Sequence, residues 1–223
     1  MTRVRSASSR DRKPKAAPRA RLELDARRAQ LLVLGRELFG RRAYDEIQIE
    51  EIAERAGVSK GLLYHYFGSK RGFYVATVET AASALLEATL EDPSAPPPER
   101  ALRSLETYLD FVSENAPAFK ALLGSGIGTD AEVAGIVERV RAEFVRRFLV
   151  GLGLEGQSRP VFELAARSWI GLVEAASLAW IDRGGVDRAT LRTFLLDTLT
   201  QVLLAALRLD PEAPITLAPP GAG

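Results

Sequence analysis

Apolar side chains recur along most of the chain at spacings of three and four residues, which is the period of an α-helix. The sequence has no stretch of any length in which apolar and polar residues alternate strictly, the pattern that indicates a half-buried strand. Leu and Ala dominate the apolar residues, and both favour helices over strands. The pattern predicts an all-α fold of about nine helices, near residues 25–39, 49–56, 60–67, 70–90, 99–114, 117–124, 130–150, 159–182 and 188–209.

Turn-forming residues separate these helices and divide the chain into unequal parts. The sequence DPSAPPP at residues 92–98 ends the fourth helix, because successive prolines remove backbone donors. The sequence GSGIGTD at 124–130 predicts a flexible loop, and Thr129 with Glu132 has the spacing of a capping box opening the next helix. We therefore expect four parts, a disordered basic arm at 1–24, a small helical unit at 25–72, a larger helical domain at 73–211 and a disordered tail at 212–223.

The segment IEEIAERAGVSKGLLYHYFGSK, residues 49–70, contains two short helices joined by a turn. Gly57 supplies the turn, because glycine adopts positive φ at little cost. Ser59 offers a side-chain oxygen to the free N–H groups of the second helix. In that helix Leu63 and Phe67 are four residues apart and share a buried face, so the intervening residues are left for the opposite face and its flanks.

This segment resembles the helix-turn-helix of the TetR/AcrR family of bacterial transcriptional regulators. The resemblance is carried by Ile52-Ala53, Ala56-Gly57-Val58-Ser59, Gly61, Leu63-Tyr64, Tyr66-Phe67 and Ser69-Lys70, and extends over roughly residues 27–75. It implies a DNA-binding unit at 25–72 and, at 73–211, a domain that binds an effector and dimerises. In one departure, Ile47-Gln48-Ile49 stands where the family usually has a capping threonine; Gln48 is a poor N-cap, and Asp45 is the alternative cap.

A helix in the major groove reaches base edges with exposed side chains, while phosphate contacts fix its position. Lys60, Gly61, Leu62 and His65 form the expected base-facing set. The full set of expected DNA contacts is Gln48, Ser59, Lys60, Gly61, Leu62, Tyr64, His65, Tyr66 and Lys70. His65, the only histidine, has two rival interpretations, a structural turn residue and a metal or catalytic role. The chain has no cysteine and no second histidine, which argues against a metal site.

Charge is divided unevenly along the chain. Residues 1–80 carry 17 Lys and Arg against 10 Asp and Glu, whereas residues 81–223 carry 13 against 19. Residues 1–21 alone have a net charge of +7 in a Ser/Pro/Ala-rich context, so we expect a disordered arm that either contacts phosphate or only aids solubility. With no cysteine, no signal peptide and no uninterrupted apolar run near the roughly 20 residues of a membrane span, we expect a cytoplasmic protein without membrane or cofactor.

The two helices nearest the C-terminus have wide apolar faces, which must be buried in the chain's own core or against a second copy. We favour a homodimer, with an interface containing Gly171, Ala175, Ala179, Leu195, Leu199, Val202 and Leu203. A two-fold dimer predicts an inverted-repeat operator in double-stranded DNA.

The middle helices carry aromatic and aliphatic residues that belong either to ordinary core or to a cavity. The resemblance implies an effector site here, and an apolar small molecule fits the residue types. Its expected lining is Tyr108, Phe111, Phe119, Leu123, Phe144, Phe148, Trp169 and Val173. Polar contacts are expected from Arg167, Ser168, Glu174 and Ser177.

We expect a sequence-specific transcriptional repressor that an apolar effector releases from DNA. The alternative from another class is an effector-insensitive architectural DNA-binding protein that uses the basic arm. A helical enzyme is a third hypothesis, but the sequence contains no recognisable nucleophile–base pair, metal cluster or phosphate loop, and we expect no catalytic residues.

Overall fold

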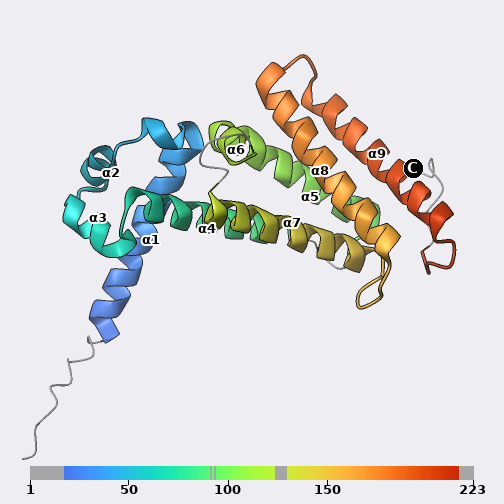
Figure 1. The fold of residues 1–223 in the computed structure, drawn as a ribbon, viewed down its shortest axis with the longest axis horizontal. Coiled ribbons are helices and arrows are strands. Elements are labelled where there is room, and N and C mark those ends of the chain that lie inside the picture. Colours follow the sequence, from blue (N-terminus) through green and yellow to red (C-terminus); the bar gives the residue numbers. More distant parts are fainter. Residues whose placement is uncertain (1–17, 91, 93, 124–129, 216–223) are drawn as a thin grey trace, which may run out of the picture.

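The protein is described by a computed structural model that covers residues 18–90, 92, 94–123 and 130–215. Over these residues it contains nine α-helices, one short 3-10 helix (η1) and no strand, which confirms the all-α prediction (Figure 1). The elements are α1 (Pro18–Arg41), η1 (Tyr44–Glu46), α2 (Ile49–Ala56), α3 (Lys60–Phe67), α4 (Lys70–Ala88), α5 (Pro97–Glu114), α6 (Ala116–Leu123), α7 (Ala131–Gly151), α8 (Pro160–Arg183) and α9 (Arg188–Leu209).

A small unit at one end of the molecule is formed by α1, α2, α3 and the first half of α4 (Figure 1). Its core packs the inward residues of α2 and α3, such as Ile52 and Leu63, against an aromatic cluster. In that cluster the Phe39 ring meets Tyr74 edge-on at 4.9 Å, and Phe67 meets Phe73 edge-on at 4.8 Å. Short helices such as α2 and α3 are unstable alone, so this packing holds α3 in place.

The structure corrects the expected start of the first helix and part of the expected C-terminal tail, and other expectations fall on residues outside those described. Helix α1 begins at Pro18 rather than Asp25, because proline suits the first turn and the Arg, Ala, Leu and Glu residues that follow are good helix formers. The expected tail at 212–223 is packed in its first part, since Ala213 is buried and Ile215 contacts the same apolar cluster. The remainder, 216–223, lies outside the described residues, as do arm residues 1–17 and loop residues 124–129.

Helix α7 begins with an aspartate cap. The side chain of Asp130 accepts hydrogen bonds from the backbone N–H groups of Glu132 at 3.0 Å and Val133 at 3.3 Å. Asp130 is therefore the N-cap in the structure, whereas the expected capping residue, Thr129, lies outside the described residues.

Helices α4 and α7 pack side by side and run in the same direction, and arginine contacts join them at three levels. At the N-terminal end, Arg71 donates to both carboxylate oxygens of Asp130, at 2.6 and 2.7 Å, and to Glu132 at 3.0 Å. Midway, Arg139 pairs with Glu79. We call these two contacts, together with a third at the C-terminal end of α4, the α4–α7 ties.

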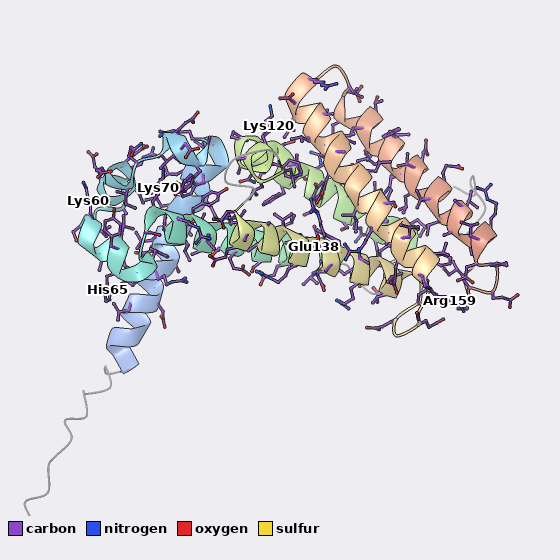
Figure 2. All side chains as sticks on the ribbon, viewed as in Figure 1. Lys60, His65, Lys70, Lys120, Glu138 and Arg159 are labelled. Carbon is purple, nitrogen blue, oxygen red and sulfur yellow. The ribbon has the colours of Figure 1, made fainter. Side chains whose placement is uncertain are left out.

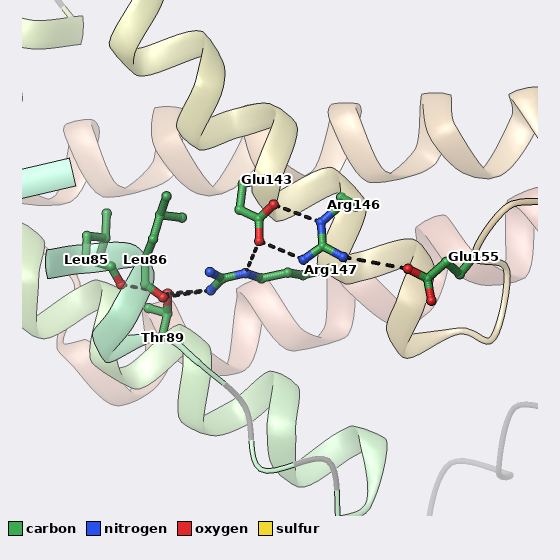
Figure 3. Close-up of polar contacts among 7 residues, drawn as sticks. All are labelled: Leu85, Leu86, Thr89, Glu143, Arg146, Arg147 and Glu155. Atoms are coloured by element: carbon green, nitrogen blue, oxygen red, sulfur yellow. Dashed lines mark hydrogen bonds and ion pairs between the residues drawn. The ribbon is translucent and has the colours of Figure 1, made fainter. Parts of the chain in front are cut away.

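The third tie, drawn in Figure 3, is the most buried of the three, because the Arg147 side chain is less exposed than those of Arg71 and Arg139. Arg147 of α7 donates to the carbonyl oxygen of Leu86 at 2.9 Å and to Thr89 Oγ1 at 3.2 Å, at the end of α4. Glu143 accepts from Arg147 at 2.8 Å, and hydrogen bonds from Arg146 and Arg147 hold the pKa of Glu143 at about 2. The Arg147 guanidinium is therefore fixed by an acceptor that stays ionised at neutral pH.

Helices α8 and α9 form the outer layer at the far end from α3 (Figure 1). Leu195 of α9 is buried with Val173 of α8 and Leu109 of α5 in one cluster. A second cluster contains Phe162 of α8 and Leu203 of α9. An ion pair of 2.9 Å joins Arg159, just before α8, to Asp210, just after α9.

Helix α1 crosses α4 closely because residue 35 is glycine. A Cβ added at Gly35 would lie 2.4 Å from Thr77 Oγ1 and 2.9 Å from Phe73 Cζ. Gly35→Ala should therefore destabilise the fold by about 1–3 kcal/mol, since the crossing is already close-packed. Chemical denaturation measures the difference.

Gly135→Ala on α7 is the matched control, because a Cβ there meets nothing within 4 Å among the described residues. It should stabilise the protein by about 0.5–1 kcal/mol through helix propensity. Equal effects of the two substitutions would contradict the close-crossing argument.

Candidate nucleic-acid interface and ligand cavity

The turn between α2 and α3 is set by backbone conformation and by a side-chain cap. Gly57 ends α2 with φ of 63°, a left-handed conformation that favours glycine. Ser59 then caps α3, its Oγ accepting from the Leu62 N–H at 3.2 Å. Leu63 is buried and Phe67 packs against the same core, so the remaining face of α3 points outward.

The nine expected DNA contacts all retain solvent exposure at this end of the molecule. Lys60 and His65 lie on the outer side of the unit, at the end far from α8 and α9 (Figure 2). The exposed members are Gln48, Ser59, Lys60, Gly61, Tyr64 and His65, and the half-buried ones are Leu62, Tyr66 and Lys70. The structure therefore gathers the set on and beside α3.

The start of α2 has no side-chain cap. Gln48 is the N-cap residue but makes no capping bond, and Asp45 lies in η1, so the expectation that Asp45 caps this helix is wrong. Glu46 instead accepts a bond from the Ala43 N–H at 3.3 Å. Two acidic residues, Glu50 and Glu51, occupy the first turn, where the helix dipole favours negative charge.

Sequence reasoning missed an ion pair that joins the two helices of the motif. Lys60 Nζ at the start of α3 lies 2.5 Å from Glu50 Oε1 on α2, with both side chains about half exposed. The hydrogen bond from Lys60 lowers the pKa of Glu50. Their ten-residue separation gave no helical-spacing signal, because the pair forms only after the turn folds.

Lys70 is held at the other edge of the unit. Its ammonium lies 4.2 Å from the centre of the Tyr44 ring, a cation–π contact at the start of α4. On the α1 side, the Arg28 guanidinium lies 5.4 Å from the Phe67 ring centre. Both cations are therefore placed by aromatic rings of the unit.

The segment that contains η1, α2 and α3, residues 44–70, has a net negative charge. Residues 44–70 contain five Asp and Glu against three Lys and Arg. The excess of positive charge in the first part of the chain lies elsewhere, in α1 and in the residues before it. Attraction to phosphate must therefore come mainly from outside the helix-turn-helix.

A cavity of about 650 Å³ extends through the larger domain, within the usual range for small-molecule sites. It begins near Gly40 and Asn115, where α1 meets the end of α5, and reaches Leu199 of α9. The wall is largely apolar. It includes all eight residues expected from the sequence, namely Tyr108, Phe111, Phe119, Leu123, Phe144, Phe148, Trp169 and Val173.

Of the four expected polar contacts, only Glu174 lines the cavity. Arg167 is exposed and pairs with Glu138 at 2.9 Å, and Ser168 is exposed on the same outer side of α8. Glu174 does line the cavity, and Arg141 donates to its carboxylate at 2.8–3.1 Å. Ser177 is fully buried on α8 and does not line the cavity, so that expectation is wrong.

The expected dimer residues divide between two faces. Gly171, Ala175 and Ala179 are exposed on α8. Leu195 and Leu203, in contrast, are buried in the chain's own core, and Leu199 and Val202 are half-buried against it, so the expected α9 set is wrong as an accessible surface. The exposed large apolar residues of these two helices are Leu164, Phe194, Leu204 and Leu209.

Among the described residues no group of three His, Asp or Glu side chains is placed to hold a metal ion. The described residues therefore offer no set of metal ligands that includes His65. His65 instead lies 5.8 Å from the Tyr66 ring on the outward part of α3.

Sequence families match both parts of the chain. The family described as "Bacterial regulatory proteins, tetR family" matches residues 31–77, and "Tetracyclin repressor-like, C-terminal domain" matches residues 97–202. Two curated relatives are the transcriptional activator FasR of Mycolicibacterium smegmatis, 31% identical over 120 residues, and the regulator BetI of Escherichia coli, 35% identical over 101 residues. These matches cover 53% and 44% of this chain, which spans about half of each relative (55% and 52%).

Solved structures support the same assignment. A tetR-family regulator from Streptomyces coelicolor is 34% identical, with a TM-score of 0.79 and 85% of each chain covered. FadR from Bacillus subtilis, solved in complex with stearoyl-CoA, shares the fold alone, at 17% identity and a TM-score of 0.62, over 77% of this chain and 96% of FadR. The outward α3 on its aromatic core and the matches across both parts lead to one conclusion. The chain belongs to the TetR family of bacterial transcriptional regulators, which bind DNA through a helix-turn-helix.

Proposed function

We propose that this protein is a dimeric, sequence-specific repressor. An apolar small molecule bound in the cavity lowers its affinity for the operator. The single observation that carries the proposal is the arrangement of α3. Its reading face is open to solvent, and the helix that follows it, α4, forms a wall of the cavity. Such a protein acts on cytoplasmic DNA.

The outer face of α8 and α9 supports a homodimer. Its exposed residues include Gly171, Ala175 and Ala179 on α8 and Phe194 and Leu204 on α9. Both helices are long and apolar enough to cross a bilayer by length and composition alone. Exposed Asp197 and Gln201 interrupt the face, which suits a protein partner better than lipid. A two-fold pair places two α3 helices on successive major grooves.

The cavity supports an apolar effector, because its wall is built mainly from aromatic and aliphatic side chains. FadR from Bacillus subtilis, which shares this fold, was solved in complex with stearoyl-CoA, a ligand with a long apolar acyl chain. The relative FasR is named a transcriptional activator, so the family resemblance alone does not give the sign of regulation. We propose repression, with the ligand-free dimer bound to DNA.

The α4–α7 ties supply the route from cavity to DNA. Val137, Val140 and Phe144 of α7 line the cavity, while Arg71 and Arg147 tie α7 to α4 near both ends of α4. A ligand that displaces α7 therefore displaces α4 and, through it, α3. The coupling equals the difference in ligand affinity between the two states, typically about 1–3 kcal/mol.

Selection of bound sequences from random DNA by the purified full-length protein tests this function. Enrichment of an inverted repeat supports a two-fold, sequence-specific regulator. Binding without enrichment, with a steep salt dependence, would support the architectural alternative instead. A reporter gene with the recovered repeat overlapping its promoter then distinguishes repression from activation.

Lys60 and Glu50 give a first mutational prediction on the recovered operator. Lys60→Ala should relax base preference at one position of each half-site, at a cost of about 1–3 kcal/mol in discrimination. Glu50→Gln should raise affinity for all sequences by about two- to fivefold at roughly 0.1 M salt, because it removes repulsion from phosphate and frees Lys60. Fluorescence anisotropy over a salt series measures both effects.

Glu54→Gln is the matched control for Glu50, since Glu54 is an exposed carboxylate on the same helix. An equal rise in affinity for the two variants would show that net charge alone is responsible. Unchanged base preference in Lys60→Ala would remove Lys60 from the reading set.

The substitution Asp130→Asn tests the first α4–α7 tie, because two possible roles of Asp130 predict opposite changes in affinity for the operator. Asparagine keeps the N-cap of α7 but loses the ionic partner of Arg71. If the tie orients α3, operator affinity should fall by about two- to tenfold. If Asp130 acts only through its charge, affinity should rise, because a negative charge near DNA is lost.

Glu99→Gln provides a reference for charge removal far from α3, since Glu99 pairs with Arg103 on the exposed side of α5. The same anisotropy titration applies to both variants. A rise in affinity for Asp130→Asn, relative to Glu99→Gln, would exclude the orienting role.

A further inference from the structure

The wall of the cavity includes two side chains that also belong to the core of the helix-turn-helix unit. Phe39 near the end of α1 and Tyr74 in the first half of α4 line the cavity, and both are buried in the cluster that contains the inward residues of α2 and α3. Their rings meet edge-on, with centroids 4.9 Å apart. The cavity and the helix-turn-helix unit therefore share these two rings as a common wall.

Tyr44 of η1 is the third ring of this group. It stacks on Phe39 at 6.2 Å, with 21° between the ring planes, and meets Tyr74 edge-on at 5.0 Å. Each of the three rings contacts the other two, and in a close-packed core a shift of one ring displaces its neighbours. Burial, followed by the charge of Asp45, raises the pKa of the Tyr44 phenol, so this ring is uncharged at physiological pH.

Tyr44 also places the ammonium of Lys70, which lies 4.2 Å from the centre of the Tyr44 ring. This contact differs from the ion pair between Lys60 and Glu50, because an uncharged ring attracts the ammonium without cancelling its charge. The N–H donors of Lys70 also stay available to an acceptor such as a phosphate oxygen. The ring therefore holds Lys70 at the start of α4 in a form suited to a phosphate contact.

We propose that Tyr44 is a positioning residue that links the cavity wall to Lys70, so that a molecule in contact with Phe39 and Tyr74 moves the Tyr44 ring and with it the Lys70 ammonium. The proposal rests on the proposed function, in that the cavity takes the effector and Lys70 meets a DNA phosphate. It adds a second route from cavity to DNA, through three aromatic rings on α1, η1 and α4. Phosphate contacts carry no base preference, so this route changes affinity for all sequences alike.

A double-mutant cycle tests the link from Tyr44 to Lys70 in the full-length protein. Lys70→Met should weaken binding to a short duplex of arbitrary sequence by about three- to tenfold at roughly 0.1 M salt, and should lower the salt slope by about one. Tyr44→Leu should weaken binding by about two- to fivefold, but should have no further effect in the Lys70→Met background. Tyr44→Phe keeps the ring and should bind like wild type. Fluorescence anisotropy over a salt series measures all four proteins.

Phe39→Leu and Phe148→Leu test the link from the cavity wall to Lys70. Both replace a phenylalanine of the wall by leucine, but Phe39 contacts Tyr44, whereas Phe148 contacts Trp169. Phe39→Leu should weaken duplex binding by about two- to threefold in the wild-type background and leave it unchanged in the Lys70→Met background. Phe148→Leu should leave it unchanged in both. Circular dichroism checks that each variant is folded at the assay temperature.

Two results would overturn the positioning role, namely an equal loss of affinity from Tyr44→Leu with and without Lys70, and a Tyr44→Phe variant as weak as Tyr44→Leu. Equal effects of Phe39→Leu and Phe148→Leu would overturn the link to the cavity. If Tyr44→Leu does not fold, the cycle of Phe39→Leu with Lys70→Met decides the whole route, because Tyr44 is the ring between them.

The duplex has arbitrary sequence, so these titrations are independent of the operator selection. A failed selection would reject the sequence-specific regulator while leaving the link between the rings and Lys70 intact. Conversely, an enriched operator together with additive effects of Tyr44→Leu and Lys70→Met would reject only the positioning role.

Discussion

The parallel pairing of α4 with α7 is the constraint on which the arrangement of the molecule depends. Helix α4 belongs to both parts of the protein, because its first half completes the core around α3 and its second half forms a cavity wall. A single helix ending in the proline-rich segment would be free to pivot. The arginine contacts at Asp130, Glu79 and Thr89 join it to α7 along its length.

The charge distribution separates two tasks that many DNA-binding units combine. Residues 44–70 carry a net negative charge, and Lys60 at the start of α3 is held by Glu50 in the free protein. A unit of this kind gains little from non-specific attraction and must exchange one ion pair for another when it binds. Under the proposed function, discrimination by α3 and attraction by α1 and the basic residues before it are carried by different segments.

Local signals in the sequence predicted most of the fold and the outward face of α3. Gly57, Ser59, and the four-residue spacing of Leu63 and Phe67 act within a few residues, and the structure confirms each of these local contacts. The expected cavity wall was predictable for a similar reason, since its aromatic residues lie on four neighbouring helices, α5 to α8. The pair between Glu50 and Lys60 and the tie between Arg71 and Asp130 were not predictable, because they depend on how the helices are placed.

Helix α9 shows why the accessible surface was assigned wrongly. Apolar residues occur on all sides of it, and Phe194 is exposed where its neighbour Leu195 is fully buried, as Leu204 is beside Leu203. Neighbouring positions on a helix differ by about 100° around the axis, so an apolar pattern this broad does not identify the inward face. Only the contacts of α5 and α8 decide it.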